Sequence, residues 1–263
     1  MKAEAVKNHI VQWLSDYAMK AKAKGFVVGV SGGIDSATTS TLCAETGLKV
    51  TLLNMPISQA KDQLDRGLKH MNALSERYPN VSVLSVPLDG VFDAFKSAQT
   101  LTAAEEELTH LALANSRARL RMSTLYYVAQ CTSSLVAGTG NKVEDFGVGF
   151  YTKYGDGGVD LSPIADLTKT EVWDLGKHLG VNQEIIDAPP TDGLWGDNRS
   201  DEDQIGASYR ELEWAMQMHE AHKSVDEFEG REREVYQIFL KFHNANKHKM
   251  DPIPVCEIPN ELR

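Results

Sequence analysis

Short apolar runs alternate with longer stretches of helical spacing along the chain. Runs that predict β-strands lie at residues 26–30, 49–55, 81–86 and 134–137. Stretches that predict helices lie at residues 3–23, 36–46, 60–78 and 102–131. This order of strands and helices predicts parallel pairing with right-handed crossovers. We therefore expect an α/β fold with a doubly wound, Rossmann-like parallel sheet flanked by helices, built as one domain over residues 1–263.

Capping motifs and turn formers mark the later elements. The sequence from Thr102 to Glu105 has the form of a capping box that opens the long helix, and Thr168–Glu171 has the same form for a further helix. Residues 145–165 hold too many turn formers for a regular element, and a loop of that length is usually functional or disordered. Ala188–Ser200 is a second loop, and a helix is expected to start after Ser200.

The first apolar run ends in a turn that suits a phosphate. It breaks at Ser31-Gly32-Gly33, and two consecutive glycines let backbone N–H groups approach an anion beside the positive end of the next helix. The Lys-Ser/Thr pair of a Walker loop is missing, and Asp35 lies in its place. Because a lone acid would repel phosphate, we interpret Asp35 as the ligand of a bridging cation. A plain strand–turn–helix corner is the alternative.

A second glycine-containing turn follows the fourth run, at Gly138–Glu144. In a doubly wound sheet, the first strand and the strand added on its other side are neighbours at the switch point, where ligands bind. Asp35 and Glu144 are therefore expected to face one another, and two carboxylates beside a phosphate loop predict a magnesium site. Lys169 is expected in the first turn of its helix, where the helix dipole disfavours a cation, and this favours a functional role.

The composition is typical of a globular protein, with 42% apolar and 24% charged residues. There is no run of about 18 uncharged apolar residues and no signal peptide, so we expect no membrane partner and a cytoplasmic location. The net charge of −10 argues against a nucleic-acid partner that needs a broad basic surface. Cys43, Cys131 and Cys256 fit neither a disulfide framework nor a metal cluster, and we expect them to be reduced and mostly buried.

The segment Ser31–Ser36 resembles the signature of the PP-loop ATP pyrophosphatases, which split ATP between the α and β phosphates. Nearly the whole chain resembles the ammonia-dependent NAD synthetases. The segments that carry this second resemblance are Ala118–Met122, Gly138–Glu144, Gly149–Gly158, Lys169-Thr170, Pro190–Leu194 and Lys247–Lys249. Together these segments are more specific than the loop, which many unrelated ligases share.

The resemblance implies an ammonia-dependent NAD(+) synthetase that amidates nicotinic acid adenine dinucleotide (deamido-NAD) to NAD. The nicotinate carboxylate would attack the α-phosphate of ATP and release pyrophosphate. Ammonia would then attack the acyl adenylate and release AMP. Mg²⁺ is the implied cofactor, and ATP is the implied co-substrate.

The resemblance also implies roles for individual residues. Asp35 and Lys169 would be catalytic, and Asp35 and Glu144 would bind the metal. The residues implied for ATP are Gly29, Val30, Ser31, Gly32, Gly33, Ile34, Asp35, Ser36, Thr139, Lys169 and Thr191. The residues implied for deamido-NAD are Arg119, Lys153, Asp160, His248 and Lys249.

Other interpretations stay open. Helical geometry puts Arg119 roughly 200° around its helix from the arginines two residues away, so the three cannot meet one ligand, and Arg119 alone could be a surface arginine. Glu144 fits a solvated loop acid, and His248-Lys249 fits a frayed tail. A different PP-loop ligase, such as a tRNA-thiolation or GMP-forming enzyme, is an alternative function. A non-catalytic adenine-nucleotide-binding module is another.

The long helical stretch also predicts assembly. Residues 102–131 carry more apolar side chains than one sheet face would cover, so part of the stretch is expected to pack on a twofold-related copy. The resemblance likewise implies a homodimer, in which Arg119, Lys153, His248 and Lys249 act on the ATP site of the partner. No glutaminase domain is expected in residues 1–263. None of the cysteines has the setting of an activated thiolate, so ammonia is the expected nitrogen source.

Overall fold

The computed structural model describes residues 1–100, 105–191 and 200–263. The strands are β1 (Gly25–Gly29), β2 (Lys49–Asn54), β3 (Val81–Ser85) and β4 (Leu135–Val136). The helices are α1 (Ala3–Lys20), α2 (Ile34–Glu45), α3 (Lys61–Arg77), α4 (Asp89–Ser97), α5 (Glu106–Thr132), α6 (Lys169–His178), α7 (Gln183–Ile186), α8 (Asp201–Ile205), α9 (Tyr209–Glu220) and α10 (Gly230–Met250). Three further turns are η1 (Val143–Val148), η2 (Val225–Glu227) and η3 (Asn260–Leu262).

The sheet has the topology expected from the sequence. In the described part of the chain its strands are parallel and follow the order β3-β2-β1-β4. The chain therefore builds outward from β1 through β2 to β3 and returns to place β4 on the other side of β1. This reversal makes the carboxyl ends of β1 and β4 the switch point of a doubly wound sheet, which confirms the predicted fold class.

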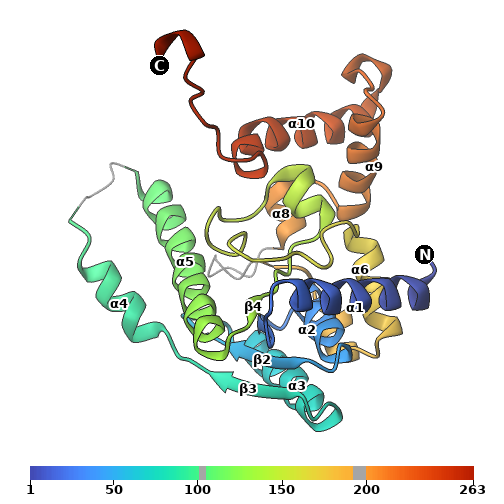
Figure 1. Ribbon diagram of the computed structural model, residues 1–263. Helices are drawn as coiled ribbons and strands as arrows, with labels where there is room; N and C mark the ends of the chain where they lie inside the picture. The colour runs from blue at the N-terminus through green and yellow to red at the C-terminus, as the bar shows by residue number, and fades with distance from the viewer. Residues whose placement is uncertain (101–104, 192–199) are drawn as a thin grey trace.

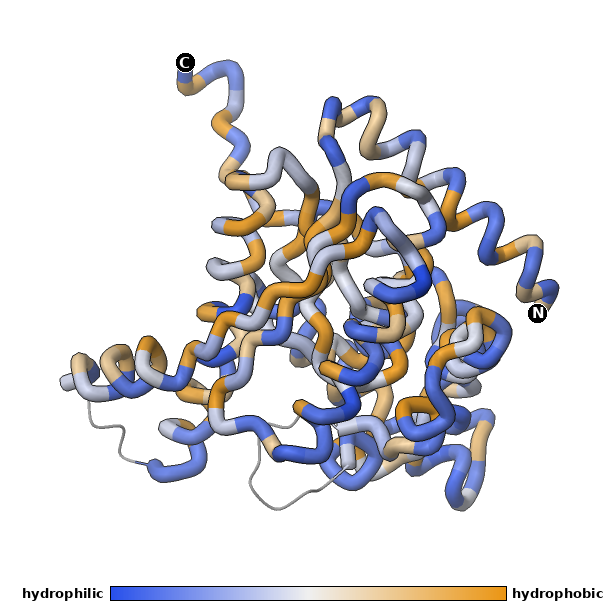
Figure 2. The backbone as a smooth tube through the Cα atoms, turned by 90° about the horizontal axis from the view of Figure 1, so that it is seen from below, coloured by the Kyte–Doolittle hydropathy of each residue, from blue (hydrophilic) through white to orange (hydrophobic). Residues whose placement is uncertain are grey.

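Side chains along the strands alternate between two hydrophobic layers. Phe26 and Val28 of β1 pack with α1, α2, α3 and α6 on one face, whereas Val27 packs with α5 on the other face. Figure 1 shows these helices on either side of the sheet. Figure 2 shows hydrophobic residues concentrated along the central strands and hydrophilic residues around them. The central strand β1 and most of β2 are therefore buried on both faces, as a parallel arrangement favours, whereas the edge strand β3 is exposed from Ser82 to Ser85.

A second helical layer has its own hydrophobic core. Tyr209 and Leu212 of α9 pack against Tyr236 and Phe239 of α10 and against Val143 of η1. Two side chains of α10 also hold η1 by its backbone, because His243 Nδ1 lies 2.7 Å from the oxygen of Gly147 and Asn246 Nδ2 donates to the oxygen of Val148 over 2.8 Å. The turn after β4 is thus fixed from the C-terminal layer.

Several sequence predictions were wrong in detail. Helix α4 was missed because it is short and none of its residues is buried. Residues 143–148 form the π-helical turn η1, although the region from 145 was expected to hold no regular element. The cap of α5 is Glu105, without a side-chain hydrogen bond. The predicted partner Thr102 lies outside the described residues, as do residues 192–199 of the Ala188–Ser200 loop.

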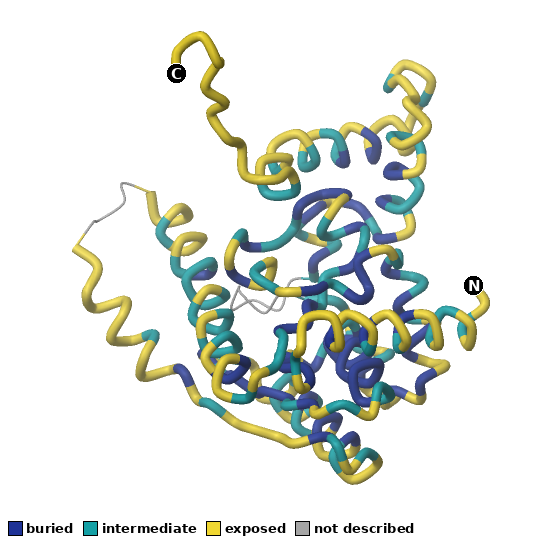
Figure 3. Tube along the Cα trace, viewed as in Figure 1, coloured by how far each residue is buried: buried dark blue, intermediate teal, exposed yellow. Residues whose placement is uncertain are grey.

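The prediction of mostly buried cysteines was also wrong. Cys43 is buried, but Cys131 and Cys256 are exposed. Cys131 lies near the end of α5, and Cys256 lies in the extended segment after α10, where every residue is exposed. Figure 3 shows this segment leaving the body of the molecule. No helix in residues 1–100, 105–191 or 200–263 is long and apolar enough to cross a membrane.

Candidate active site

The turn between β1 and α2 has the geometry of an anion site. Gly32 has φ of +91°, and a Cβ there would lie 2.4 Å from the oxygen of Gln63, so this position requires glycine. The hydroxyl of Ser31 accepts from the N–H of Gly33 at 3.2 Å, and the hydroxyl of Ser36 donates to the oxygen of Gly33 at 3.0 Å. These bonds fix the turn at the positive end of α2, where a phosphate would be stabilised.

Lys169 joins the two turns at the switch point. Thr168 and Glu171 form the predicted capping box, so α6 begins at Lys169. The Lys169 side chain is buried, and its Nζ lies 2.7 Å from Asp35 Oδ2 and 2.9 Å from Glu144 Oε1. Burial lowers the pKa of Lys169, but the two carboxylates outweigh it and hold the pKa above its ordinary value. Lys169 is therefore a permanent cation, and the predicted pair of acids does converge.

The two carboxyl groups differ in their surroundings. Burial raises the pKa of Asp35 above its ordinary value, with Lys169 opposing and the charge of Glu144 adding to the rise. Burial also raises the pKa of Glu144, but Lys169 and the hydroxyl of Tyr209 outweigh it, so this pKa lies below its ordinary value. Tyr209 donates to Glu144 Oε1 at 2.5 Å. Glu144 is thus the more firmly ionised acid of the pair.

Two further buried acids at the site have raised pKa values, so both lose their protons less readily than an ordinary carboxyl group. Burial, with the charges of Glu144, Asp156 and Asp35, raises the pKa of Asp145 to about 8. Burial also raises the pKa of Asp156, although Asp156 Oδ1 accepts from the N–H of Thr152 at 3.0 Å. An excess of carboxylates over Lys169 attracts cations. The oxygens of Asp35 and Glu144 are of the kind that Mg²⁺ prefers.

Four of the residues predicted for deamido-NAD form a second cluster. Lys153 Nζ donates to the oxygen of His248 at 2.7 Å, and Arg119 Nε donates to the oxygen of Lys153 at 3.3 Å. Lys249 Nζ donates to the oxygen of Tyr151 at 2.7 Å. The loop around residues 150–158 therefore gathers basic groups from α5 and from the end of α10 within one chain.

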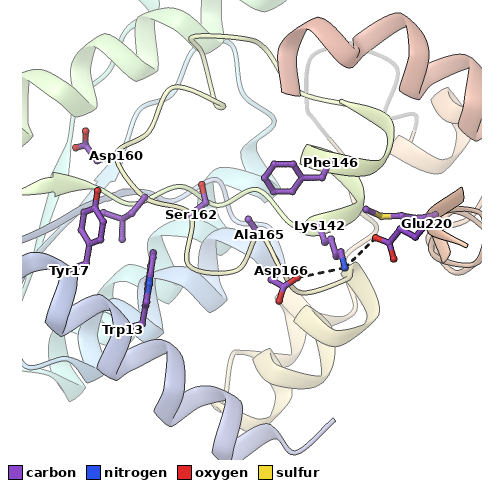
Figure 4. Close-up of a pocket in the computed structure, with 11 residues that line it drawn as sticks. Trp13, Tyr17, Lys142, Phe146, Asp160, Ser162, Ala165, Asp166 and Glu220 are labelled. Carbon is purple, nitrogen blue, oxygen red and sulfur yellow. Dashed lines mark ion pairs between the residues drawn. The ribbon is translucent and has the colours of Figure 1, made fainter. Parts of the chain in front are cut away.

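Asp160, the fifth of these residues, lies apart from that cluster. Its carboxylate accepts from the N–H of Val136 at 2.8 Å and from the hydroxyl of Tyr126 at 3.1 Å. Asp160 also lines a hollow of about 470 Å³ together with Trp13, Tyr17 and Phe146, which Figure 4 shows with their side chains. A groove with aromatic walls and a carboxylate is chemically suited to a nucleoside.

Helix α5 presents its arginines to different surroundings, as helical spacing predicts. Arg121 Nε donates to the oxygen of Met55, at the end of β2, over 2.9 Å. Burial and the charge of Arg117 lower the pKa of Arg121 to about 10, while Asp156 and Asp89 act in the opposite direction. Arg121 therefore lies on the side of the helix that faces the acids of the site, whereas Arg119 faces Lys153.

The structure gives positions for the two threonines predicted for ATP and brings two further residues, Asn141 and Tyr209, to the acids of the site. Thr139 lies in the turn after β4, at the same edge of the sheet as the Ser31–Ser36 turn. Thr191 is the last described residue before the segment 192–199. Tyr209 and Asn141 were missed as site residues. Asn141 belongs to the quoted Gly138–Glu144 segment and could have been found there, but nothing local marks Tyr209.

Within the described residues, no group of three or more His, Cys, Asp or Glu side chains could hold a metal by itself. Asp35 and Glu144 are the residues that could hold Mg²⁺.

Comparisons with known proteins agree with this geometry. Residues 6–253 match the family model described as NAD synthase. An NH(3)-dependent NAD(+) synthetase from Alkaliphilus metalliredigens is 36% identical over 251 residues, which cover 93% of this chain and 96% of that protein. An NMN synthetase structure from Francisella tularensis matches with a TM-score of 0.83 at 32% identity over 99% of both chains. An NH3-dependent NAD synthetase from Campylobacter jejuni, in complex with the nitrate ion, matches with a TM-score of 0.77 at 26% identity over 98% of this chain and 100% of that chain.

Proposed function

Because the chain belongs to the NAD synthase family, we propose that it amidates deamido-NAD to NAD with ATP and free ammonia. The nicotinate carboxylate displaces pyrophosphate from the α-phosphate of ATP, and ammonia then displaces AMP from the acyl adenylate. A carboxylate resists substitution until one of its oxygens becomes part of a good leaving group, which is what adenylation achieves. ATP is therefore a co-substrate.

The observation that carries this proposal is the convergence of Asp35, Lys169 and Glu144 beside the Ser31–Ser36 turn. A module that only binds a nucleotide has no need of two carboxylates around a buried cation. Phosphoryl transfer, in contrast, needs positive charge placed where the leaving pyrophosphate develops negative charge. The cluster therefore favours catalysis over binding alone.

The oxygen donors of Asp35 and Glu144 fit Mg²⁺ in number and chemistry. Bound there, Mg²⁺ would polarise phosphate oxygens and neutralise charge on the leaving pyrophosphate. Lys169 contributes a second, permanent positive charge at the same edge. The N–H groups around Gly32 and Gly33 orient the phosphates at the start of α2.

For the remaining substrate contacts we keep the assignment made from the sequence. Thr139 and Thr191 complete the ATP set, and Arg119, Lys153, Asp160, His248 and Lys249 bind deamido-NAD. The basic cluster around Lys153 supports contacts with the diphosphate of the dinucleotide. The aromatic hollow beside Asp160 supports binding of its adenosine half.

We propose that the protein is a homodimer and that it works in the cytoplasm, where ATP is available. Exposed apolar side chains on α5 and α4 support the assembly, since Tyr127 is 71% and Leu108 55% exposed. We also propose that this one domain draws free ammonia and needs no glutaminase. Burial of Cys43 raises the pKa of its thiol, which disfavours a nucleophilic role for that cysteine.

A second candidate substrate is nicotinic acid mononucleotide. The similarity to the structure of an NMN synthetase from Francisella tularensis, with 32% identity over 99% of both chains, is the observation that favours it. Both reactions convert a nicotinate carboxylate to an amide, so the adenylating centre would be unchanged. The two differ in whether the adenosine half of the pyridine substrate must be bound.

The test is a product assay with ATP, Mg²⁺, ammonium and either pyridine substrate. We expect AMP, pyrophosphate and NAD in equal amounts from deamido-NAD. A strong preference for the mononucleotide would select the second candidate. Failure to amidate either substrate would contradict the proposed function.

A further inference from the structure

Asn141 is buried at the centre of the site, between the two acids assigned to the metal. Asn141 follows Gly138-Thr139-Gly140 in the sequence and is 0% exposed. The amide nitrogen Nδ2 donates to Asp35 Oδ1 at 3.1 Å, and the amide oxygen Oδ1 accepts from the N–H of Glu144 at 3.1 Å. One side chain therefore links the start of α2 to the turn after β4.

The orientation of this amide is unambiguous. The backbone N–H of Glu144 can only donate, so it must meet the amide oxygen of Asn141. The amide nitrogen then necessarily faces Asp35 and donates to its Oδ1. In the opposite orientation the amide nitrogen would face the N–H of Glu144 and the amide oxygen would face the carboxyl group of Asp35, and neither contact is favourable.

The hydrogen bonds divide the carboxylate oxygens between neighbours. Lys169 takes Asp35 Oδ2, so Asp35 is held from two sides. Lys169 and Tyr209 share Glu144 Oε1. Lys169 is a flexible point charge, whereas the short, planar amide of Asn141 fixes both direction and distance.

We propose that Asn141 is a positioning residue that holds the Asp35 carboxylate against the backbone of Glu144, so that one divalent cation can bind both acids. This inference rests on the proposed function, because that function supplies the cation. Asn141 carries no charge, so it orients the acids without competing with the metal. Partners that orient metal ligands typically change metal affinity by about 10- to 100-fold when they are removed.

A purely structural role for Asn141 would lower stability and leave metal affinity unchanged. Asn80 offers a matched control at the opposite edge of the sheet. Its amide nitrogen donates to the backbone oxygens of Ala44 and Leu48 over 3.0 and 2.7 Å. Asn80→Ala should lower the melting temperature without altering the site. Asn141→Ser, which can make at most one of the two bonds, accompanies Asn141→Ala in case the alanine variant does not fold.

The experiment measures Mn²⁺ affinity by electron paramagnetic resonance, with an ATP analogue that carries a methylene group between the α and β phosphates. We expect both Asn141 variants to bind Mn²⁺ about tenfold more weakly or worse. The Asn80 variant should bind like the wild type. The KM for the pyridine substrate should stay within about twofold while kcat falls.

Unchanged Mn²⁺ affinity in both Asn141 variants, with only a lower melting temperature, would overturn the inference. A wild-type protein that forms product but binds no Mn²⁺ would overturn it together with the metal site. A wild-type protein that binds Mn²⁺ normally but amidates neither substrate would contradict the proposed function alone. In that case weaker Mn²⁺ binding by the Asn141 variants would still support the positioning role.

Discussion

At the scale of single residues, Lys169 and the acids around it stabilise one another's buried charges. A cation in the first turn of a helix opposes the helix dipole, and burial of its side chain adds a desolvation cost. Asp35 and Glu144 offset both effects through contacts of 2.7 and 2.9 Å. Removing any member leaves a buried charge without its partner, so each substitution has a distinct expected consequence.

Replacement of Asp35 and replacement of Glu144 should change the magnesium dependence of the reaction in different ways. Asp35→Asn should abolish product formation, because it removes charge from both the metal and Lys169. Glu144→Gln should retain some activity but need a higher Mg²⁺ concentration for half-maximal rate. The measurement is the initial rate as a function of Mg²⁺ concentration. Asp226→Asn, at an exposed side chain away from the site, is the control. A normal magnesium dependence in both site variants would remove the metal site from the account.

Lys169→Met should lower kcat by about 100- to 1000-fold, comparable to loss of one charge-stabilising group in other enzymes. It should also destabilise the ligand-free protein by about 3 kcal/mol, because two acids then lie together without a cation. Denaturant unfolding measures this loss, and added Mg²⁺ with ATP should restore part of the stability. Lys177→Met, at an exposed position of the same helix, controls for loss of a lysine. Wild-type turnover in Lys169→Met would contradict the role given to this residue.

At the scale of elements, the site depends on how α10 holds η1. Gly149 ends that turn with φ of +65°, and a Cβ there would lie 2.4 Å from Cβ of Asn246. Gly47 has a similar φ of +72°, but a Cβ there would meet nothing within 4 Å. Alanine substitutions at the two positions therefore distinguish the effect of backbone strain alone from the effect of a clash with α10.

Gly47→Ala should cost about 1 kcal/mol of stability, from the left-handed backbone alone, and should leave turnover intact. Gly149→Ala carries the same strain and also displaces α10, so it should cost several-fold more and lower activity by misplacing Glu144. Unfolding free energies and initial rates of the two variants are compared directly. Equal behaviour of the two variants would show that the contact between α10 and η1 does not position the site.

A buried histidine between α2 and α3 should make the stability of the fold depend on pH. His70 is buried, its Nε2 lies 2.9 Å from the hydroxyl of Ser40, and burial lowers its pKa from 6.5 to about 4. Because the folded pKa is the lower one, the stabilisation is complete above about pH 6.5 and is lost as pH falls toward 4. The loss approaches about 3 kcal/mol. His70→Gln should flatten this part of the stability curve, and an unchanged slope would contradict the assignment.

The elements also show what the sequence can and cannot predict. The strand order and the Thr168–Glu171 cap were predictable because period, glycines and capping residues are local signals. The partners of Glu144 were only partly predictable. Asn141 is three residues away, but Tyr209 is brought to Glu144 by packing of α9 on η1. Helix α4 was overlooked although Val91, Phe92 and Phe95 recur at helical spacing, because it is only 9 residues long.

At the scale of the whole molecule, exposed apolar surface on α4 and α5 argues for a twofold partner. The basic cluster of Arg119, Lys153, His248 and Lys249 lies within one chain. Whether this cluster serves its own ATP site or that of the partner is a question of assembly. The sequence-based prediction, which we retain as a proposal, is that it serves the partner.

Mixing two inactive variants tests this assembly. Asp35→Ala and Arg119→Ala should each be inactive, and random reassortment should recover about a quarter of wild-type activity, because half of the dimers are mixed and each holds one intact site. A mixture of Asp35→Ala with Lys169→Met should stay inactive, since both substitutions damage the same half of the site. Mixed dimers of the first pair that form but remain inactive would show that the cluster acts within its own chain.

We propose that this site joins the nicotinate carboxylate to the α-phosphate of ATP, and transfer of an oxygen isotope tests this step most directly. The pyridine substrate is labelled with ¹⁸O in its carboxylate and supplied with ATP, Mg²⁺ and ammonium. The account predicts one ¹⁸O atom in each AMP formed and none in pyrophosphate, because the oxygen that attacks the α-phosphate leaves with AMP when ammonia attacks the carbonyl carbon. Unlabelled AMP, or label in pyrophosphate, would contradict adenylation of the carboxylate at this site.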